Sequence, residues 1–121
     1  MAKCKCKQNH IHKSHGEADY CDYIFKKYEN GDIQNVEVEK KFLLYDCNNG
    51  YVCTHYVDFL ITNYDGSKAV YEFKGTPQNS QSFLTWKMKK ALFQYNYPNI
   101  PYYVEYLKKF NVRRKREDFK N

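Results

Sequence analysis

Residues 51–74 read YVCTHYVDFLITNYDGSKAVYEFK, and this stretch decides the fold. Its first half, from Tyr51 to Thr62, is rich in Val, Thr, Tyr and Ile, the residues that favour strands. The next five residues, Asn63-Tyr64-Asp65-Gly66-Ser67, have the composition of a tight turn. Lys68 to Lys74 then returns as a second strand. The stretch therefore predicts an antiparallel β-hairpin.

Further elements are expected on both sides of this hairpin. Before it, a helical pattern runs from Ser14 to Asn30, and an extended strand follows from Ile33 to Tyr45. After it come a helix from about residue 80 to Tyr95 and a short strand from Tyr102 to Tyr106. A helix between two strands is typical of a parallel crossover. The order αβββαβ predicts an α+β fold, an α/β sandwich with a four-stranded mixed sheet flanked by helices.

The ends and buried faces of the two helices can also be predicted. Ser14 is a good N-cap, and Glu17 then falls at the capping-box position. Asn30-Gly31 is a stop signal. In the second helix the predicted buried stripe consists of Leu84, Met88, Ala91, Leu92 and Tyr95.

Length and composition limit the class of protein. The 121 residues suffice for one domain, 1–121, which we divide into a Cys/His-rich N-terminal arm (1–13), a core and a basic tail (107–121). The net charge of +6 admits nucleic acid as a partner. No apolar stretch approaches the roughly 20 residues that span a bilayer, and the first residues lack the apolar segment of a signal peptide. We therefore expect a cytoplasmic protein without a membrane partner, its five cysteines reduced.

The hairpin places acidic residues where strands rarely have them. Asp58 lies within the first strand, and Glu72-Phe73-Lys74 ends the second. A turn of three or five residues would set Asp58 opposite Glu72, whereas a two-residue turn would set it opposite Phe73. Directly opposed carboxylates repel each other, and a divalent cation would resolve the conflict. Alternatively, these residues are solvated polar groups on an exposed face.

Several segments together resemble a known superfamily. Asp58 and Glu72-Phe73-Lys74 occur with 12–21 (HKSHGEADYC), 30–33 (NGDI), 56–59 (YVDF) and 71–75 (YEFKG). Their order and spacing over residues 12–106 resemble the PD-(D/E)XK phosphodiesterases, and more specifically a small phage- and prophage-encoded family of endonucleases. Val57 stands where the superfamily's name has proline.

The resemblance implies a restriction-endonuclease-like core and a hydrolase that cleaves DNA with Mg²⁺ or Mn²⁺. Asp58 and Glu72 would bind the metal, with the Phe73 carbonyl as a further ligand. Lys74 would orient or activate the attacking water, and Glu17 would complete the metal shell. For Glu17 the alternative is a capping role alone. The resemblance also implies action in the host cell cytoplasm, and it leaves open branched DNA as substrate and a homodimer as the assembly.

The N-terminal arm offers a second kind of metal ligand. Zn²⁺ favours sets of four Cys and His ligands. The spacing is not that of a common zinc knuckle, so the alternative is a polar arm with Cys21 as a core residue. His55, farther along the chain, carries no signal of its own and is expected to be structural. The candidate zinc ligands are Cys4, Cys6, His10, His12, His15 and Cys21.

Basic residues could contact the DNA backbone. In the second helix Lys87, Lys90 and Gln94 share one face. A charged run at the C-terminus would bind phosphates with an affinity that falls as salt rises. Both groups could equally be solvated, and a non-catalytic nucleic-acid-binding module with a nuclease-like fold, stabilised by zinc, is the rival function. The run consists of Arg113, Arg114, Lys115 and Arg116.

Overall fold

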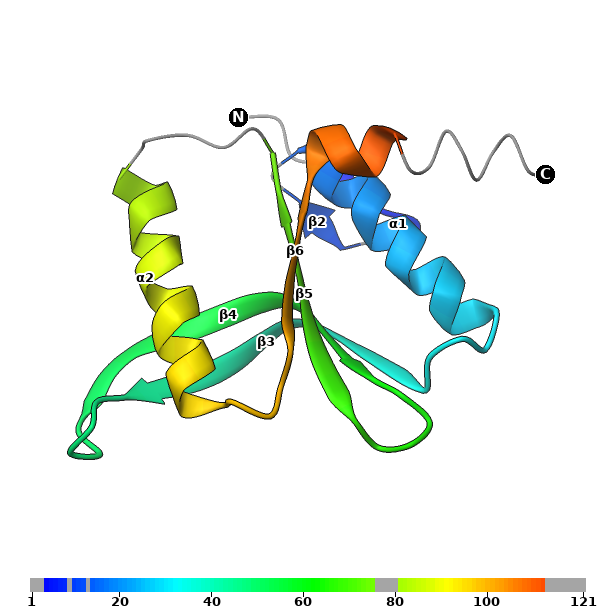
Figure 1. Cartoon of the computed structure of the whole chain (residues 1–121). Coiled ribbons are helices and arrows are strands. Elements are labelled where there is room, and N and C mark those ends of the chain that lie inside the picture. The colour runs from blue at the N-terminus through cyan, green and yellow to red at the C-terminus, as the bar shows by residue number, and fades with distance from the viewer. Residues whose placement is uncertain (1–3, 9, 13, 76–80, 113–121) are drawn as a thin grey trace.

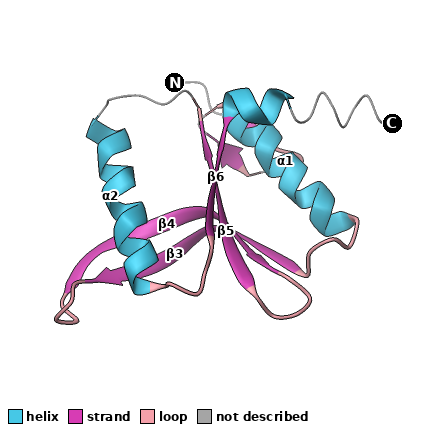
Figure 2. Ribbon diagram, in the orientation of Figure 1, coloured by secondary structure: helices cyan, strands magenta, loops and turns pink. Residues whose placement is uncertain are grey.

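A four-stranded mixed sheet of order β3-β4-β5-β6 lies between two helices in this computed structural model (Figures 1 and 2). Strands β3, β4 and β5 are antiparallel, whereas β5 and β6 are parallel. The structure describes residues 4–8, 10–12, 14–75 and 81–112. The predicted α+β fold with a four-stranded mixed sheet is confirmed. The elements are β1 (Cys4–Lys5), β2 (Ile11–His12), α1 (His15–Glu29), β3 (Asn35–Tyr45), β4 (Tyr51–Thr62), β5 (Lys68–Lys74), α2 (Gln81–Asn96) and β6 (Tyr102–Tyr106).

Helix α1 begins and ends as its sequence predicts. The Ser14 side chain accepts a hydrogen bond from the Glu17 N–H at 3.2 Å. After Asn30, Gly31 takes a φ of 81°, a left-handed conformation that costs glycine little. The N–H groups of Gly31 and Asp32 then donate to carbonyls of the last turn, at 3.1 and 2.9 Å, in a Schellman arrangement.

The β4–β5 hairpin adopts the register that opposes Asp58 to Glu72. Its loop has five residues, closed by a hydrogen bond from the Asn63 N–H to the Ser67 carbonyl at 2.8 Å. The residue numbers of each pair, such as Phe59↔Tyr71, sum to 130. Continuing this register by one position brings the two acidic residues face to face. The five-residue alternative for the turn is therefore correct.

Two hydrophobic clusters cover the two faces of the sheet. The first, which we call the α1 cluster, gathers aromatic and aliphatic side chains between α1 and the sheet. The second, the α2 cluster, lies between α2 and the sheet. Buried members of the α1 cluster include Ala18, Tyr20, Cys21, Ile24, Phe59 and Phe73. Those of the α2 cluster are Leu44, Val57, Leu60, Val70 and Phe93.

Strand β3 exchanges faces near its midpoint. Val36 and Val38 pack against the α1 cluster, whereas Phe42 and Leu44 belong to the α2 cluster. All four occupy even positions and would share one face of a regular strand. The exchange occurs at Glu39, whose φ of 53° lies in the left-handed region. The distorted backbone at Glu39 thus allows β3 to contribute side chains to both the α1 cluster and the α2 cluster.

The distortion at Glu39 lies across the ladder from Asp58. The flanking pairs are Val38↔Phe59 and Lys40↔Val57. Strand β4 turns over at the same level, because Val57 joins the α2 cluster and Phe59 joins the α1 cluster. A left-handed conformation costs a residue with a Cβ about 1–2 kcal/mol. Backbone strain is therefore stored beside Asp58, and strain of this kind gathers at functional sites.

Helix α2 turns a different face to the sheet from the one predicted. Trp86 and Phe93 are buried, whereas Met88 is 72% exposed. The prediction followed aliphatic spacing, whereas Phe93 packs in the α2 cluster. Trp86 packs against the polar ends of Tyr102 and Lys74, which suits an aromatic ring with an N–H. The predicted stripe is thus wrong: Leu84, Met88, Ala91 and Tyr95 are exposed, and Leu92 is half-buried.

The predicted arm and tail are partly folded. Strands β1 and β2 form an antiparallel pair beside α1, so 1–13 is not simply a polar arm. Residues 107–112 are helical, and Phe110 packs edge-on against Tyr20 with ring centroids 5.2 Å apart. The predicted basic tail therefore begins later than Leu107. Its arginines, within 113–121, lie outside the described residues. No helix in the described part of the chain is long and apolar enough to cross a membrane.

Substitution of Glu39 tests the strained position. We expect Glu39→Gly to have a higher free energy of unfolding than Glu39→Val, by about 1–2 kcal/mol, because glycine lacks the Cβ that disfavours a positive φ. At Lys41, an exposed position on the same strand, the order should reverse, since valine is ordinarily the better strand residue. Urea denaturation of the four variants measures both differences. A more stable valine variant at both positions would contradict the strain.

Candidate functional site

At the acidic pair, side-chain hydrogen bonds take the place of the backbone hydrogen bonds between β4 and β5. The Asp58 N–H donates to Glu72 Oε1 at 3.3 Å, and the Phe73 N–H donates to Asp58 Oδ2 at 2.8 Å. The two carboxyl groups are also within hydrogen-bonding reach of each other. Each acid therefore accepts a hydrogen bond from the backbone of the opposite strand and lies close to the other acid. The predicted proximity of these groups is confirmed.

The positive charge near the two acids does not compensate for their burial. Glu72 is only 1% exposed, and burial together with the negative charge of Asp58 raises its pKa to about 9. Burial also raises the pKa of Asp58, with a further contribution from the charge of Glu17. The hydrogen bonds of Asp58 and the positive charge of Lys74 oppose this shift without overcoming it. The pair therefore holds a proton, or needs a cation.

Three side chains that the sequence did not single out surround Glu72. The Tyr102 hydroxyl donates to Glu72 Oε1 at 2.8 Å and accepts from Trp86 Nε1 at 3.3 Å. His55 Nε2 lies 2.9 Å from the same hydroxyl. When the hydroxyl proton points to Glu72, His55 donates to the hydroxyl oxygen through Nε2–H. Burial, then the charges of Lys89 and Lys74, lowers the pKa of His55 to about 4, so it is neutral.

These three residues carried little signal in the sequence. Tyr102 opens β6, which pairs in parallel with β5, so its position depends on the crossover. Trp86 belongs to the face of α2 that the stripe prediction missed. His55 precedes Asp58 by three residues, an odd spacing that would put the two on opposite faces of a regular strand. Only the change of faces in β4 brings His55 to the pair.

Lys74 lies beside the acidic pair. It follows Glu72 by two residues, on the same face of β5. Its Nζ is 4.5 Å from the centroid of the Trp86 ring, a cation–π distance. From there its charge lowers the pKa of both Asp58 and Glu72. The Trp86 ring thus holds the Lys74 ammonium beside the acidic pair.

Glu17 reaches the neighbourhood of the pair from α1. The first turn of α1 packs closely on the end of β5, since a Cβ added to Gly16 would meet the Phe73 ring at 3.2 Å. The carboxylate of Glu17 is a quarter exposed, and its Oε1 lies 3.2 Å from His12 Nδ1. Its negative charge also raises the pKa of Asp58. The side chain therefore does more than belong to a capping box.

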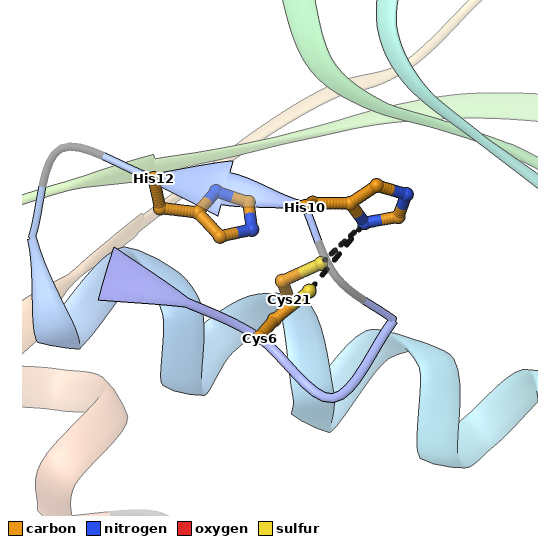
Figure 3. A group of neighbouring side chains, drawn as sticks. All are labelled: Cys6, His10, His12 and Cys21. Atoms are coloured by element: carbon orange, nitrogen blue, oxygen red, sulfur yellow. Dashed lines mark hydrogen bonds between the residues drawn. The ribbon is translucent and has the colours of Figure 1, made fainter. Parts of the chain in front are cut away.

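Four of the six predicted zinc ligands meet at one point. Figure 3 shows His10 pointing toward the sulfurs of Cys6 and Cys21, with His12 beside them. The four ligand atoms all lie within 4.8 Å of one another, so this group could hold a metal ion such as zinc. His15 is instead exposed at the start of α1. The side chain of Cys4 lies outside the described structure.

A groove beside the acidic pair carries the predicted basic residues of α2. It has a volume of about 330 Å³ and runs between α2 and β6. Lys87, Lys90 and Gln94 line it together with Trp86. The Lys90 Nζ lies 5.8 Å from the centroid of the Tyr102 ring. The groove thus combines positive charge and aromatic surface, and Trp86 links it to Tyr102 and Lys74 at the site.

Glu72→Gln tests whether the acidic pair destabilises the fold. Protonation of Glu72 stabilises the folded chain: this contribution is complete below its unfolded pKa of 4.5 and is lost as the pH rises toward 9. The amide of glutamine can accept the same hydrogen bonds and donate to Asp58, so it imitates the protonated acid.

Without added Mg²⁺ or Mn²⁺, we expect Glu72→Gln to melt higher than the parent chain, by at least about 4 °C at pH 8.5. The gap should widen from pH 7 to pH 9, above the range in which His55 titrates. Thermal melts of both proteins across this range measure it. A parent chain that is the more stable at pH 8.5 would show that the pair is adequately compensated.

One family of proteins matches this chain, and the match covers residues 1–112. It therefore includes both the acidic pair and the Cys/His cluster. No curated protein and no solved structure matches the chain. The family is described as a protein of unknown function (DUF1064), and because the match extends over far more than half of the sequence, the chain belongs to the DUF1064 family.

Proposed function

We propose that this chain is a Mg²⁺- or Mn²⁺-dependent DNA endonuclease of the PD-(D/E)XK type, with a restriction-endonuclease-like core. One observation carries the proposal: two buried carboxyl groups oppose each other on β4 and β5, both with raised pKa, and Lys74 follows two residues later. Perturbed acids of this kind gather at catalytic sites more than in structural cores. A purely structural or DNA-binding role requires no such arrangement.

The carboxylate oxygens of Asp58 and Glu72 are ligands that suit a hard divalent cation. Asp58 Oδ2 and Glu72 Oε1 are engaged by N–H and O–H donors, which leaves each carboxylate a second oxygen. Mg²⁺ favours oxygen ligands and commonly takes one or two carboxylates. Two positive charges would also favour the ionised form of both acids, whose pKa values are raised chiefly by burial. The Phe73 carbonyl and Glu17 are the further candidate ligands.

The remaining residues have separate tasks in the proposed reaction. A bound cation would supply Lewis-acid charge to a phosphodiester and make water a better nucleophile. Lys74 would hold that water or neutralise charge on the phosphate, because its ammonium is fixed over Trp86. Tyr102 orients Glu72 through its hydroxyl and is a positioning residue.

DNA is the proposed substrate because the groove beside the site combines cations with aromatic rings. Lys87 and Lys90 can neutralise phosphates there, and Trp86 and Tyr106 give apolar walls. The net charge of +6 favours a polyanion in general. The form of the DNA substrate is determined by comparing cleavage of branched, duplex and single-stranded DNA.

Cleavage assays with two variants test the proposal. Glu72→Gln should reduce the cleavage rate by at least about 10³-fold, because the site loses a charge needed to hold the cation. Its DNA affinity should hold or increase, since a negative charge near the phosphates is removed. Lys74→Ala should lower the rate while leaving Mg²⁺ binding nearly intact. Rates with Mg²⁺, Mn²⁺ and EDTA, together with filter binding, give these values.

Matched controls keep this test specific. Glu29→Gln removes an exposed carboxylate at the far end of α1, and Lys68→Ala removes an exposed lysine at the start of β5. Both should cleave like the parent chain. Binding without cleavage in every protein would favour the non-catalytic rival, and full activity in Glu72→Gln would overturn the assignment of this site.

The groove yields a separate prediction. Lys87→Ala combined with Lys90→Ala should weaken DNA binding and reduce the slope of log Kd against log salt by about 2, because two phosphate contacts are lost. Lys41→Ala, an exposed lysine on β3, should change neither quantity. Fluorescence anisotropy at several salt concentrations measures both. An unchanged slope would show that the α2 lysines face solvent rather than DNA.

A further inference from the structure

We propose that Cys6, His10, His12 and Cys21 bind one structural Zn²⁺, and that Glu17 holds His12 in place as a ligand to it. This proposal does not rest on the nuclease function. It rests on the spacing of four ligand atoms, on an unpartnered buried nitrogen, and on the parts of the fold that the four residues join.

Two of the ligand-to-ligand distances match those of a tetrahedral zinc site. With Zn–S near 2.3 Å and Zn–N near 2.05 Å, tetrahedral geometry sets the sulfur and nitrogen ligands about 3.6 Å apart. His10 Nδ1 lies 3.5 Å from both Cys6 Sγ and Cys21 Sγ. All four ligand atoms fall within 4.8 Å of one another. A common centre for four ligands therefore needs only small adjustments.

His12 supplies the most specific observation. It is 4% exposed, and its Nε2 is buried without a hydrogen-bond partner. An unpaired buried polar atom destabilises a fold unless something binds it. Its other nitrogen, Nδ1, lies 3.2 Å from Glu17 Oε1. A proton on Nδ1, held by the carboxylate, leaves the lone pair of Nε2 for a metal, as in carboxylate–histidine–zinc units.

Other uses of these residues fit less well. Cys6 and Cys21 are free thiols, 4% and 0% exposed, so a substrate could not reach a nucleophilic sulfur. Simple core packing leaves His12 Nε2 unexplained. Two sulfurs and two imidazole nitrogens form the set that Zn²⁺ prefers, whereas Mg²⁺ and Ca²⁺ prefer oxygen.

The ligands connect parts of the fold that would otherwise be weakly joined. Cys6 and His10 flank the turn between β1 and β2, His12 lies in β2, and Cys21 lies in α1. A hairpin of two-residue strands is marginal by itself, and a metal that ties it to a helix stabilises it. Glu17 precedes Cys21 by one helical turn, so both project from the same face of α1.

Metal analysis of the intact chain tests the site directly. Protein made in zinc-supplemented medium should contain one zinc per chain, and cobalt substitution should give thiolate-to-cobalt absorption bands. Cys6→Ser and Cys21→Ser should each lose both signals. Cys47→Ser and His15→Gln, which alter a free cysteine and an exposed histidine outside the group, should retain them.

A milder variant covers the case in which the cysteine variants do not fold. Glu17→Gln leaves all four ligands in place and should weaken zinc binding by roughly 10–100-fold in competition with a chelator. Thiol labelling of the parent chain gives a second measurement: Cys47 should react at once, and Cys6 and Cys21 only after chelation.

The proposal fails if the parent chain binds neither zinc nor cobalt, or if Cys6 and Cys21 are recovered as a disulfide from freshly prepared protein. Unchanged zinc affinity in Glu17→Gln would overturn the role of Glu17 alone. None of these measurements involves DNA cleavage, so failure here and failure of the nuclease proposal can be told apart.

Discussion

Two carboxyl groups, buried against each other with too little positive charge nearby, constrain the centre of this protein. Asp58 and Glu72 take the place of ladder hydrogen bonds by bonding to the opposite backbone, so β4 and β5 stay joined where the regular ladder ends. The raised pKa of Glu72 shows that this arrangement is costly at neutral pH. A fold selected for stability alone would place apolar side chains here. This cost is the physical reason for proposing that the pair has a function, one that the surrounding structure supports.

The support comes from both layers of the fold. On the α2 side, Tyr102 donates to Glu72, while Trp86 and His55 hold its hydroxyl in position. On the α1 side, the close approach of Gly16 to Phe73 brings Glu17 near the pair. Lys74 provides the nearby positive charge. The two helices lie on opposite faces of the sheet. Side chains from both helices approach the acids because β3 and β4 change faces at this level. The strained backbone at Glu39 marks that level.

Much of this fold follows from local sequence. The hairpin turn, its five-residue loop and the caps of α1 depend on residues close together in the chain, and the register that opposes the acids follows from the loop length. The polarity of the sheet under α2 depends instead on side chains from three strands, so aliphatic spacing in α2 selected the wrong face. His55 was missed because regular alternation puts it and Asp58 on opposite faces of β4, whereas β4 turns over between Val57 and Phe59. The Cys/His group was correctly expected among six residues, but the spacing could not choose four of them.

The two proposed metal sites divide the chemistry of the chain by ligand type. Soft sulfur and nitrogen ligands gather between the β1–β2 hairpin and α1, and hard oxygen ligands gather between β4 and β5, so each site favours a different ion. Glu17 stands between them, with Oε1 toward His12 and a charge that acts on Asp58. A change at the zinc ligands therefore has a short route to the acidic pair, through the placement of one carboxylate. The pair itself is fixed by the hairpin register and by Tyr102, neither of which involves the N-terminal residues. In the two proposals taken together, the zinc site would thus adjust the surroundings of the acidic pair without creating the pair.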